Sequence, residues 1–324
     1  MVLSLLSGRE GGDHKRVARP SRPGAKGLAP IMTLREVLAS GKFTVTAELS
    51  PPGNPVAEPM RRAASALAGL VDATNVTDNP AATPKVSPVV ASAWLIEQGV
   101  EPVMQITTRD RNLLALQSDL LGAWAIGVRN LLVLSGDPLK VGKYAGLARP
   151  VGDVDSNALI KLVTTLNGGH LAAGETLSTP TDFFVAAALN PLVDAAPKID
   201  GKVAAGARFF QTNIVYDVAR FAEWFAPHVE SGVLGGAPVL VGVMPPRSIA
   251  ALKHMHANIP GVEVDDATFA KLAGRAGDDA KAAGVAVAVA VIEQLRELPG
   301  VSGVHIMAPG WEAEAITRVA GAIR

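Results

Sequence analysis

Residues 44–52, Thr44-Val45-Thr46-Ala47-Glu48-Leu49-Ser50-Pro51-Pro52, decide the fold that this sequence predicts. The β-branched residues at the start of the segment favour a strand, and the two prolines end further strand pairing. A carboxylate, Glu48, therefore stands where the strand ends. If the fold is a barrel of parallel strands, this end lies on the active-site rim. A Glu at a strand end can also be merely solvated, so the interpretation depends on whether the pattern recurs.

The pattern recurs seven times along the chain as an apolar segment followed by sequence with helical spacing. Eight strands of this kind are the number that a (β/α)8 barrel requires. The competing architecture, an open doubly wound sheet, lacks its GxGxxG fingerprint after the first strand. The sequence therefore predicts an α/β fold, a single (β/α)8 TIM barrel over residues 32–324. The further strands are expected at 73–77, 102–106, 130–134, 183–188, 208–212, 238–243 and 303–307.

Residues 1–31 differ from the rest of the chain. They carry six Lys or Arg residues against Glu10 and Asp13, several Gly and Pro, and no sustained apolar period. Such a composition cannot bury enough surface to order itself, so a disordered basic tail is expected. The opening residues are too short, and lack the basic segment, for a signal peptide. A cytoplasmic location is expected.

The composition of the 324 residues excludes several classes of function. Thirty basic residues balance thirty acidic ones, which argues against nucleic acid or an anionic membrane as the main partner. The absence of cysteine excludes disulfides, iron–sulfur clusters and thiolate zinc sites. No apolar run reaches the roughly 18 residues of a membrane-spanning helix. No His or Asp spacing is typical of a metal site, so no metal is predicted.

Polar side chains follow most of the predicted strands, and in a barrel they converge on one mouth. The set is rich in carboxylates and amides and has little positive charge. It suits a nitrogen-rich ring, whose N–H groups need acceptors, better than a sugar phosphate. Acids in such a mouth can also donate protons when desolvation raises their pKa. The residues are Glu48, Thr77, Asp78, Thr107, Asp110, Asp137, Asn190, Gln211 and His305.

Several of these residues have a plainer interpretation. Asp137 in Ser-Gly-Asp-Pro and Asn190 before a proline are both good turn chemistry. His305 lies inside an apolar strand, where a satisfied core or rim histidine is the more frequent case. Gln211 is harder to dismiss, because it directly follows two phenylalanines and needs partners if it is buried. The loop 140–155 is unusually long for a compact domain, which favours a cofactor-covering role.

Six motifs together carry a resemblance to a known family. They are Ala47-Glu48-Leu49-Ser50-Pro51-Pro52, Val76-Thr77-Asp78-Asn79-Pro80, Thr108-Arg109-Asp110-Arg111-Asn112, Leu116-Gln117-Ser118-Asp119-Leu120-Leu121-Gly122, Ser135-Gly136-Asp137-Pro138 and Phe210-Gln211-Thr212. In this order at strand ends, they resemble the methylenetetrahydrofolate reductase family, in its short bacterial type with the catalytic barrel only. The resemblance runs from about Thr33 to the C-terminus.

The resemblance implies an oxidoreductase of one-carbon metabolism and methionine biosynthesis. Members of the family pass hydride from NADH or NADPH through non-covalent FAD to 5,10-methylenetetrahydrofolate, giving 5-methyltetrahydrofolate. The implied partners are the folate substrate and the nicotinamide nucleotide. Whether the chain forms a homo-oligomer or works with an accessory redox subunit stays open.

The resemblance also implies roles for individual residues. Glu48 resembles the acid that protonates N10 and opens the imidazolidine ring, and Asp137 resembles the catalytic carboxylate beside the flavin and the pterin. Gln211, Asp137 and Asn190 would bind the substrate. The cofactor-binding residues would be Thr77, Thr107, Asp110, Ser135, Gly136, Asp155, Asn157 and Lys202.

The sequence departs from the family pattern at several positions. Gln105 stands where many relatives have His, and Lys85 where Arg is expected. Ala188 replaces an aromatic residue near the flavin, and Asn213 replaces a Gln. These departures leave two alternatives open. One is a flavin-independent, NADH-dependent methylene-tetrahydropterin reductase, and the other is a folate-binding subunit that depends on a partner for NADH oxidation.

Overall fold

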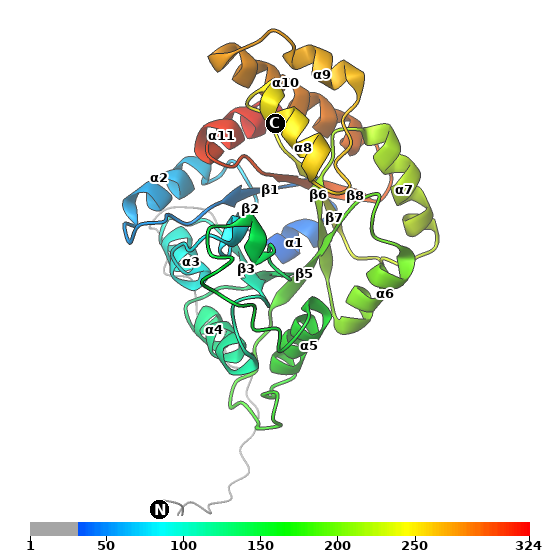
Figure 1. Cartoon of the computed structure of the whole chain (residues 1–324). Coiled ribbons are helices and arrows are strands. Elements are labelled where there is room, and N and C mark those ends of the chain that lie inside the picture. Colours follow the sequence, from blue (N-terminus) through cyan, green and yellow to red (C-terminus); the bar gives the residue numbers. More distant parts are fainter. Residues whose placement is uncertain (1–31) are drawn as a thin grey trace, which may run out of the picture. The chain divides into compact units, whose positions relative to one another are not determined.

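The computed structural model describes residues 32–324, and eight parallel strands close into a barrel within this range (Figure 1). Each strand pairs with the next in the chain, and β1 pairs with β8 to close the ring. The predicted (β/α)8 barrel is therefore confirmed, whereas the predicted tail lies outside the described residues. The strands are β1 (Thr44–Leu49), β2 (Ala73–Val76), β3 (Pro102–Thr107), β4 (Asn130–Leu134), β5 (Phe184–Leu189), β6 (Phe209–Ile214), β7 (Val239–Val243) and β8 (Val301–Ile306).

Helices surround the barrel, and most begin at a capping residue that the sequence supplies. Thr33 and Glu36 form a reciprocal capping box, and Asn112, Asp155 and Ser248 each accept a main-chain N–H. The helices are α1 (Leu34–Ala39), α2 (Glu58–Leu67), α3 (Pro88–Glu97), α4 (Leu113–Ala125), α5 (Ser156–Asn167), α6 (Ala196–Ala205), α7 (Val218–Glu230), α8 (Ile249–Asn258), α9 (Asp266–Leu272), α10 (Gly277–Arg296) and α11 (Glu312–Ala322), with short 3₁₀ turns η1 (Pro80–Ala82) and η2 (Leu139–Val141).

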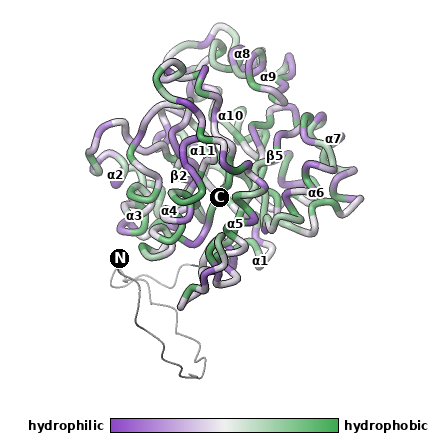
Figure 2. The backbone as a smooth tube through the Cα atoms, turned by 60° about the horizontal axis from the view of Figure 1, so that its bottom comes forward, coloured by the Kyte–Doolittle hydropathy of each residue, from purple (hydrophilic) through white to green (hydrophobic). Residues whose placement is uncertain are grey.

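Some of the outer helices, α2 and α7 among them, are clearly amphipathic. On α7 the buried Val218, Phe221 and Phe225 share one face, and the hydropathy trace shows both residue classes along this helix (Figure 2). Within residues 32–324, no helix combines the length and the apolar character needed to cross a membrane.

Strand alternation decides which side chains enter the barrel. Ala47 and Leu49 belong to the core between strands and outer helices, so Thr46 and Glu48 face the interior. Leu34 of α1 packs with inward-facing apolar side chains of the strands and closes the amino-terminal end of the barrel. Polar side chains further up the strands are therefore accessible from the carboxyl end only.

Some predicted boundaries differ from the structure. β6 continues to Ile214, two residues beyond its predicted end, and its pairing with β7 shifts register after Gln211. Further along the chain, α9 and α10 are separate helices, because Gly274 between them has a φ of +72°.

Gly284 of α10 provides a test of the close packing. A Cβ at this position would lie 2.0 Å from the main-chain oxygen of Pro246. Gly284→Ala is therefore expected to lower the free energy of unfolding by about 1–3 kcal/mol. Gly122→Ala on α4, where a Cβ would meet nothing within 4 Å, is the matched control and should gain up to about 1 kcal/mol from helix propensity. Similar denaturant midpoints for the two variants would contradict the packing argument.

Candidate active site

Six polar side chains form a connected layer inside the barrel, near the carboxyl ends of the strands. Five of them are buried, with at most 6% of their surface exposed, and Glu48 is partly exposed. Buried polar groups need partners, and these side chains find them mainly in one another. The members are Thr46, Glu48, Asn75, Gln105, Gln211 and His305.

The two oxygens of the Glu48 carboxyl group are in different surroundings. Oε2 accepts a hydrogen bond from Gln105 Nε2 at 2.7 Å and lies 3.7 Å from His305 Nε2. No residue between 32 and 324 is seen to bond to Oε1, and 18% of the side chain is exposed. Glu48 is therefore anchored through one oxygen and presents the other to the mouth. This is the arrangement that a positioned proton donor needs.

The sequence-based prediction of the site included Glu48, Gln211 and His305. In the structure Thr46 connects Gln211 to His305, and His305 lies 3.7 Å from Glu48. The prediction missed Asn75 and Thr46, and it noted Gln105 only as a departure from the family. The period of two along a strand would have indicated Thr46 and Asn75, because they lie two residues before Glu48 and Thr77.

Thr107, which was predicted to bind the cofactor, is hydrogen-bonded to a buried carboxylate. Asp78 Oδ2 accepts hydrogen bonds from the Thr107 N–H and hydroxyl, both at 2.9 Å, and from Arg111 Nη1 at 2.7 Å. Burial lowers the pKa of Arg111, but the hydrogen bonds and charges of Asp78 and Asp119 outweigh burial, so this pKa is raised. The hydroxyl proton of Thr107 is therefore already used within the protein.

Arg109 joins the loops that follow β2 and β4. It donates to the main-chain oxygens of Asp137 at 2.8 Å and Asn79 at 3.2 Å, and it forms an ion pair with Asp110 at 2.6 Å. The hydrogen bond from Arg109 lowers the pKa of Asp110. The Asp137 carboxylate accepts from the Ala81 N–H through Oδ2 at 2.7 Å. Asp137 therefore links the two loops, and no hydrogen bond within residues 32–324 connects it to Glu48.

Lys202 and Asn190 meet at another buried carboxylate, Asp194. Lys202 Nζ lies 3.3 Å from Asp194 Oδ2 and also donates to the Ala188 main-chain oxygen, and Asp194 accepts from the Asn190 N–H at 3.1 Å. Burial lowers the pKa of Lys202, and the charge of Asp194 only partly offsets this effect. Burial would raise the pKa of Asp194, but Lys198, the Asn190 N–H and Lys202 together lower it.

The remaining predicted cofactor residues have different surroundings. Asp155 caps α5 through a 2.7 Å bond to the main-chain N–H three residues on. Ser135 is exposed. Gly136 has a φ of +86°, and a Cβ there would lie 3.2 Å from the Cβ atoms of Thr107 and Arg109. A glycine is therefore required at this position for the β4 loop to pack on the end of β3.

Three buried oxygen atoms fit the ligands that the family implies, a flavin and a reduced folate. Thr77 Oγ1, Asn157 Oδ1 and Asn190 Oδ1 have no hydrogen-bond partner among the described residues. Orphaned buried oxygens are uncommon, and a ring with N–H groups and a hydroxylated side arm would satisfy them. Positive charge for a diphosphate is present nearby in the loop that follows β4, at Lys140, Lys143 and Arg149, for which no ion pair is seen within residues 32–324.

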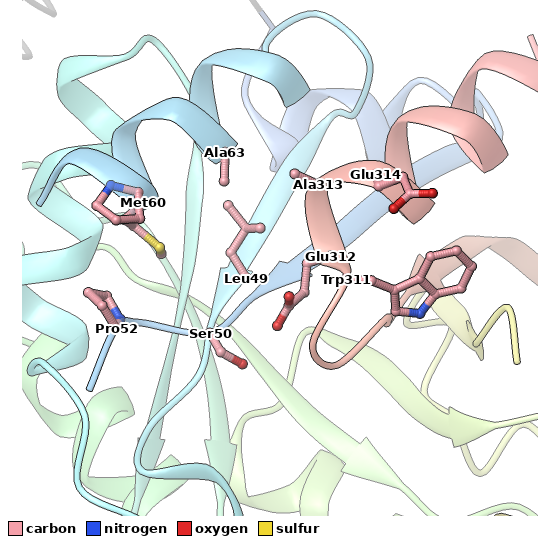
Figure 3. A pocket seen from close by; sticks show the side chains of 10 residues that line it. Leu49, Ser50, Pro52, Met60, Ala63, Trp311, Glu312, Ala313 and Glu314 are labelled. Carbon is pink, nitrogen blue, oxygen red and sulfur yellow. The ribbon is translucent and has the colours of Figure 1, made fainter. Parts of the chain in front are cut away.

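A cavity of about 370 Å³ lies beside the mouth, between α2 and α11 (Figure 3). It is lined by apolar side chains that include Leu49, Met60 and Trp311, and by the carboxylates of Glu312 and Glu314. Leu49 faces outward from β1, so this cavity is separate from the interior layer that contains Glu48. Its two carboxylates make it unfavourable for an anionic ligand.

The fold and the site define a barrel-shaped α/β protein in which one carboxyl group, that of Glu48, lies among amides in the interior layer. Residues 33–320 match the family described as Methylenetetrahydrofolate reductase, and the chain belongs to this family. The six motifs predicted this membership, which indicates a methylenetetrahydrofolate-related function.

Comparison with curated proteins finds no match. A solved structure of an uncharacterized Clostridium thermocellum protein that binds two copies of 5-methyl-5,6,7,8-tetrahydrofolic acid aligns with a TM-score of 0.63 and 13% identity, over 88% of this chain and 96% of that chain. An F420-dependent secondary alcohol dehydrogenase aligns with a TM-score of 0.49 and 13% identity, over 87% and 99%. The first likeness shows a shared fold alone, and the second is too distant to indicate more.

Proposed function

We propose that this chain reduces 5,10-methylenetetrahydrofolate to 5-methyltetrahydrofolate, with NADH or NADPH as hydride source and FAD as carrier. The observation that carries the proposal is Glu48, whose Oε2 is held by Gln105 while Oε1 remains available at the mouth of the barrel. Family membership supports the reaction class. The reduced folate bound by the similar C. thermocellum protein supports the substrate class.

In this reaction Glu48 acts as the acid. A proton passes from Oε1 to N10 of the folate, and the electron pair of the bond between N10 and the methylene carbon stays on N10. The methylene carbon becomes an iminium carbon on N5, and a hydride then converts it to the methyl group. The carboxylate left on Glu48 stabilises the neighbouring cation, and Gln105 remains bonded to Oε2 throughout.

Neutral amides and Asp137 would complete the folate site. Asp137 Oδ1 has no bond to any described residue, so it can face a ligand while Oδ2 remains on Ala81. Asn190 Oδ1 is an unpaired buried acceptor for a pterin N–H. Both roles are proposals that rest on these free acceptor atoms.

A bound flavin supplies a two-electron carrier between nicotinamide and folate. Thr77 and Asn157 would hold it through their unpaired oxygens. The basic residues of the loop 140–155 would face its diphosphate. The predicted contribution of Lys202 would require a change in its bonds to Asp194 and Ala188.

A second candidate is flavin-independent reduction by NADH. Two residues that were predicted to contact the flavin form hydrogen bonds within the protein instead: Asp137 with Ala81, and Lys202 with Asp194. These bonds favour the flavin-independent candidate. Ala188, at an inward position on β5, also lacks the aromatic ring that some relatives place near the flavin. The optical spectrum separates the two candidates.

The purified full-length chain is expected to show the spectrum of an oxidised flavin. The spectrum should bleach with NADH or NADPH under anaerobic conditions and return when methylenetetrahydrofolate is added. Thr77→Val should lower the flavin content, because it removes an unpaired hydroxyl at the inward end of β2.

The matched control is Thr74→Val. Thr74 carries an equally buried, unpaired hydroxyl, but on the outward face of β2, so flavin content should not change. A colourless protein that still reduces the folate with NADH would favour the flavin-independent candidate. A protein that binds folate and oxidises neither nucleotide would overturn both and indicate a subunit that requires a partner.

A further inference from the structure

Asn75 and Gln211 form a reciprocal pair of amide hydrogen bonds beneath Glu48. Asn75 Nδ2 donates to Gln211 Oε1 at 2.7 Å, and Gln211 Nε2 donates to Asn75 Oδ1 at 3.1 Å. Asn75 is completely buried and Gln211 is 2% exposed. The pair uses one N–H of each amide and leaves a second N–H on both, of which that of Gln211 reaches a further acceptor.

That acceptor is the hydroxyl of Thr46, 3.4 Å from Gln211 Nε2. Thr46 in turn has one proton and two acceptors within reach. His305 Nδ1 lies at 3.0 Å and the Val304 main-chain oxygen at 3.3 Å. The shorter contact leads to His305, and a ring that accepts at Nδ1 carries its proton on Nε2.

The contact between His305 and Glu48, at the other end of this chain, also requires the proton of the ring on Nε2. His305 Nε2 faces Glu48 Oε2, which already accepts from Gln105. A lone pair on Nε2 would repel the lone pairs of Oε2, whereas an N–H there is attracted to them, whether or not Oε1 carries a proton. The two ends of the chain of contacts therefore indicate the same direction of donation, from Gln211 through Thr46 and His305 toward Glu48.

We propose that Asn75 is a positioning residue for Glu48. By holding the amide of Gln211 with its NH₂ group toward Thr46, Asn75 sets His305 as the neutral tautomer protonated on Nε2. Gln105 then donates to Oε2 and the His305 Nε2–H lies 3.7 Å from the same oxygen, so the transferable proton is placed on Oε1, on the side of the mouth. The catalytic consequence rests on the proposed function, but the tautomer does not.

The tautomer can be measured directly by NMR on the full-length chain, labelled with ¹⁵N at histidine, at neutral pH and without ligand. The signals of His305 are identified by their loss in His305→Asn. The wild-type ring should carry its proton on Nε2. Asn75→Leu frees Gln211 to turn its carbonyl toward Thr46, so the Nδ1-protonated form should become populated. In this variant kcat should fall about fivefold, as for one lost hydrogen bond, with KM little changed.

Two further variants make the test specific. Thr74→Val, on the opposite face of the same strand, should keep the wild-type tautomer. Asn75→Gln combined with Gln211→Asn rebuilds an amide pair and should restore it. If Asn75→Leu does not fold, Asn75→Ala replaces it.

Three results would overturn the proposal: a wild-type ring protonated on Nδ1, a wild-type ring protonated on both nitrogens, or a folded Asn75 variant with an unchanged tautomer. Because no substrate is present, these results are independent of whether the proposed reaction is correct.

Discussion

Glu48→Gln is expected to slow methylenetetrahydrofolate reduction by about 10²–10⁴-fold, the range for a lost general acid. Glutamine keeps the volume of the side chain, and its carbonyl can still accept from Gln105. It has no carboxyl proton to give to N10, so ring opening loses its donor. Hydride removal from NADH needs no such proton and should continue at nearly the normal rate with an artificial electron acceptor.

Glu312→Gln is the matched control for this substitution. Glu312 is also partly exposed and lies at the start of α11, lining the cavity outside β1 and not the interior layer. Folate reduction should be nearly unchanged in this variant. If Glu48→Gln lowered NADH oxidation as much as folate reduction, Glu48 would belong to the nicotinamide site or to the structural core.

Asp194→Asn is expected to lower the free energy of unfolding by about 3–5 kcal/mol, the usual loss when one member of a buried ion pair is removed. The Asp194 side chain is 1% exposed and that of Lys202 is 9% exposed. In the variant, Lys202 stays buried but has lost the negative charge of Asp194, which stabilises the ammonium group against the cost of burial. Chemical denaturation of both proteins at neutral pH gives this difference.

The pH dependence identifies the cause of this loss. Burial already lowers the pKa of Lys202 below its ordinary 10.5, and removal of Asp194 should lower it further. The unfolded chain then binds more protons than the folded one between the two pKa values, so the stability of the variant rises with pH in that interval. The deficit should be largest near neutral pH and shrink as pH approaches 10.5.

Two companion variants separate the buried pair from ordinary surface charge. Asp194→Asn combined with Lys202→Met removes the unpaired charge and should recover part of the loss. Asp182→Asn breaks the exposed pair with Arg35, whose side chains are 62% and 40% exposed, and should cost less than about 1 kcal/mol. A pH-independent deficit for Asp194→Asn would mean that its hydrogen bonds, and not its charge, stabilise this region.

The features that the sequence predicts correctly are those encoded locally. The strand that carries Glu48 depends on residues a few positions apart, so its pattern is visible in the chain. The barrel follows from eight repetitions of one local pattern. Membership of the family follows from motifs at the ends of those strands.

The contacts within the site depend on strand register, which local patterns do not contain. Gln105 reaches Glu48 across 57 positions of sequence, and the Asn75–Gln211 pair spans 136. The bond from Ala81 to Asp137 also depends on the left-handed backbone of Ala81, at φ 50°. A non-glycine residue in that conformation gives no signal in the sequence.

The pairing of β1 with β8 has a consequence for how the chain is made. Thr44 pairs with Gly303, so about 260 residues must be translated between the two partners. At about 5–20 residues per second, the ribosome needs roughly 13–50 s for that interval. During this time the free edge of β1 has no partner, and the nascent sheet can pair with other chains. Elongation speed and chaperone supply, and not the final stability of the barrel, should therefore limit the yield of folded protein in a cell.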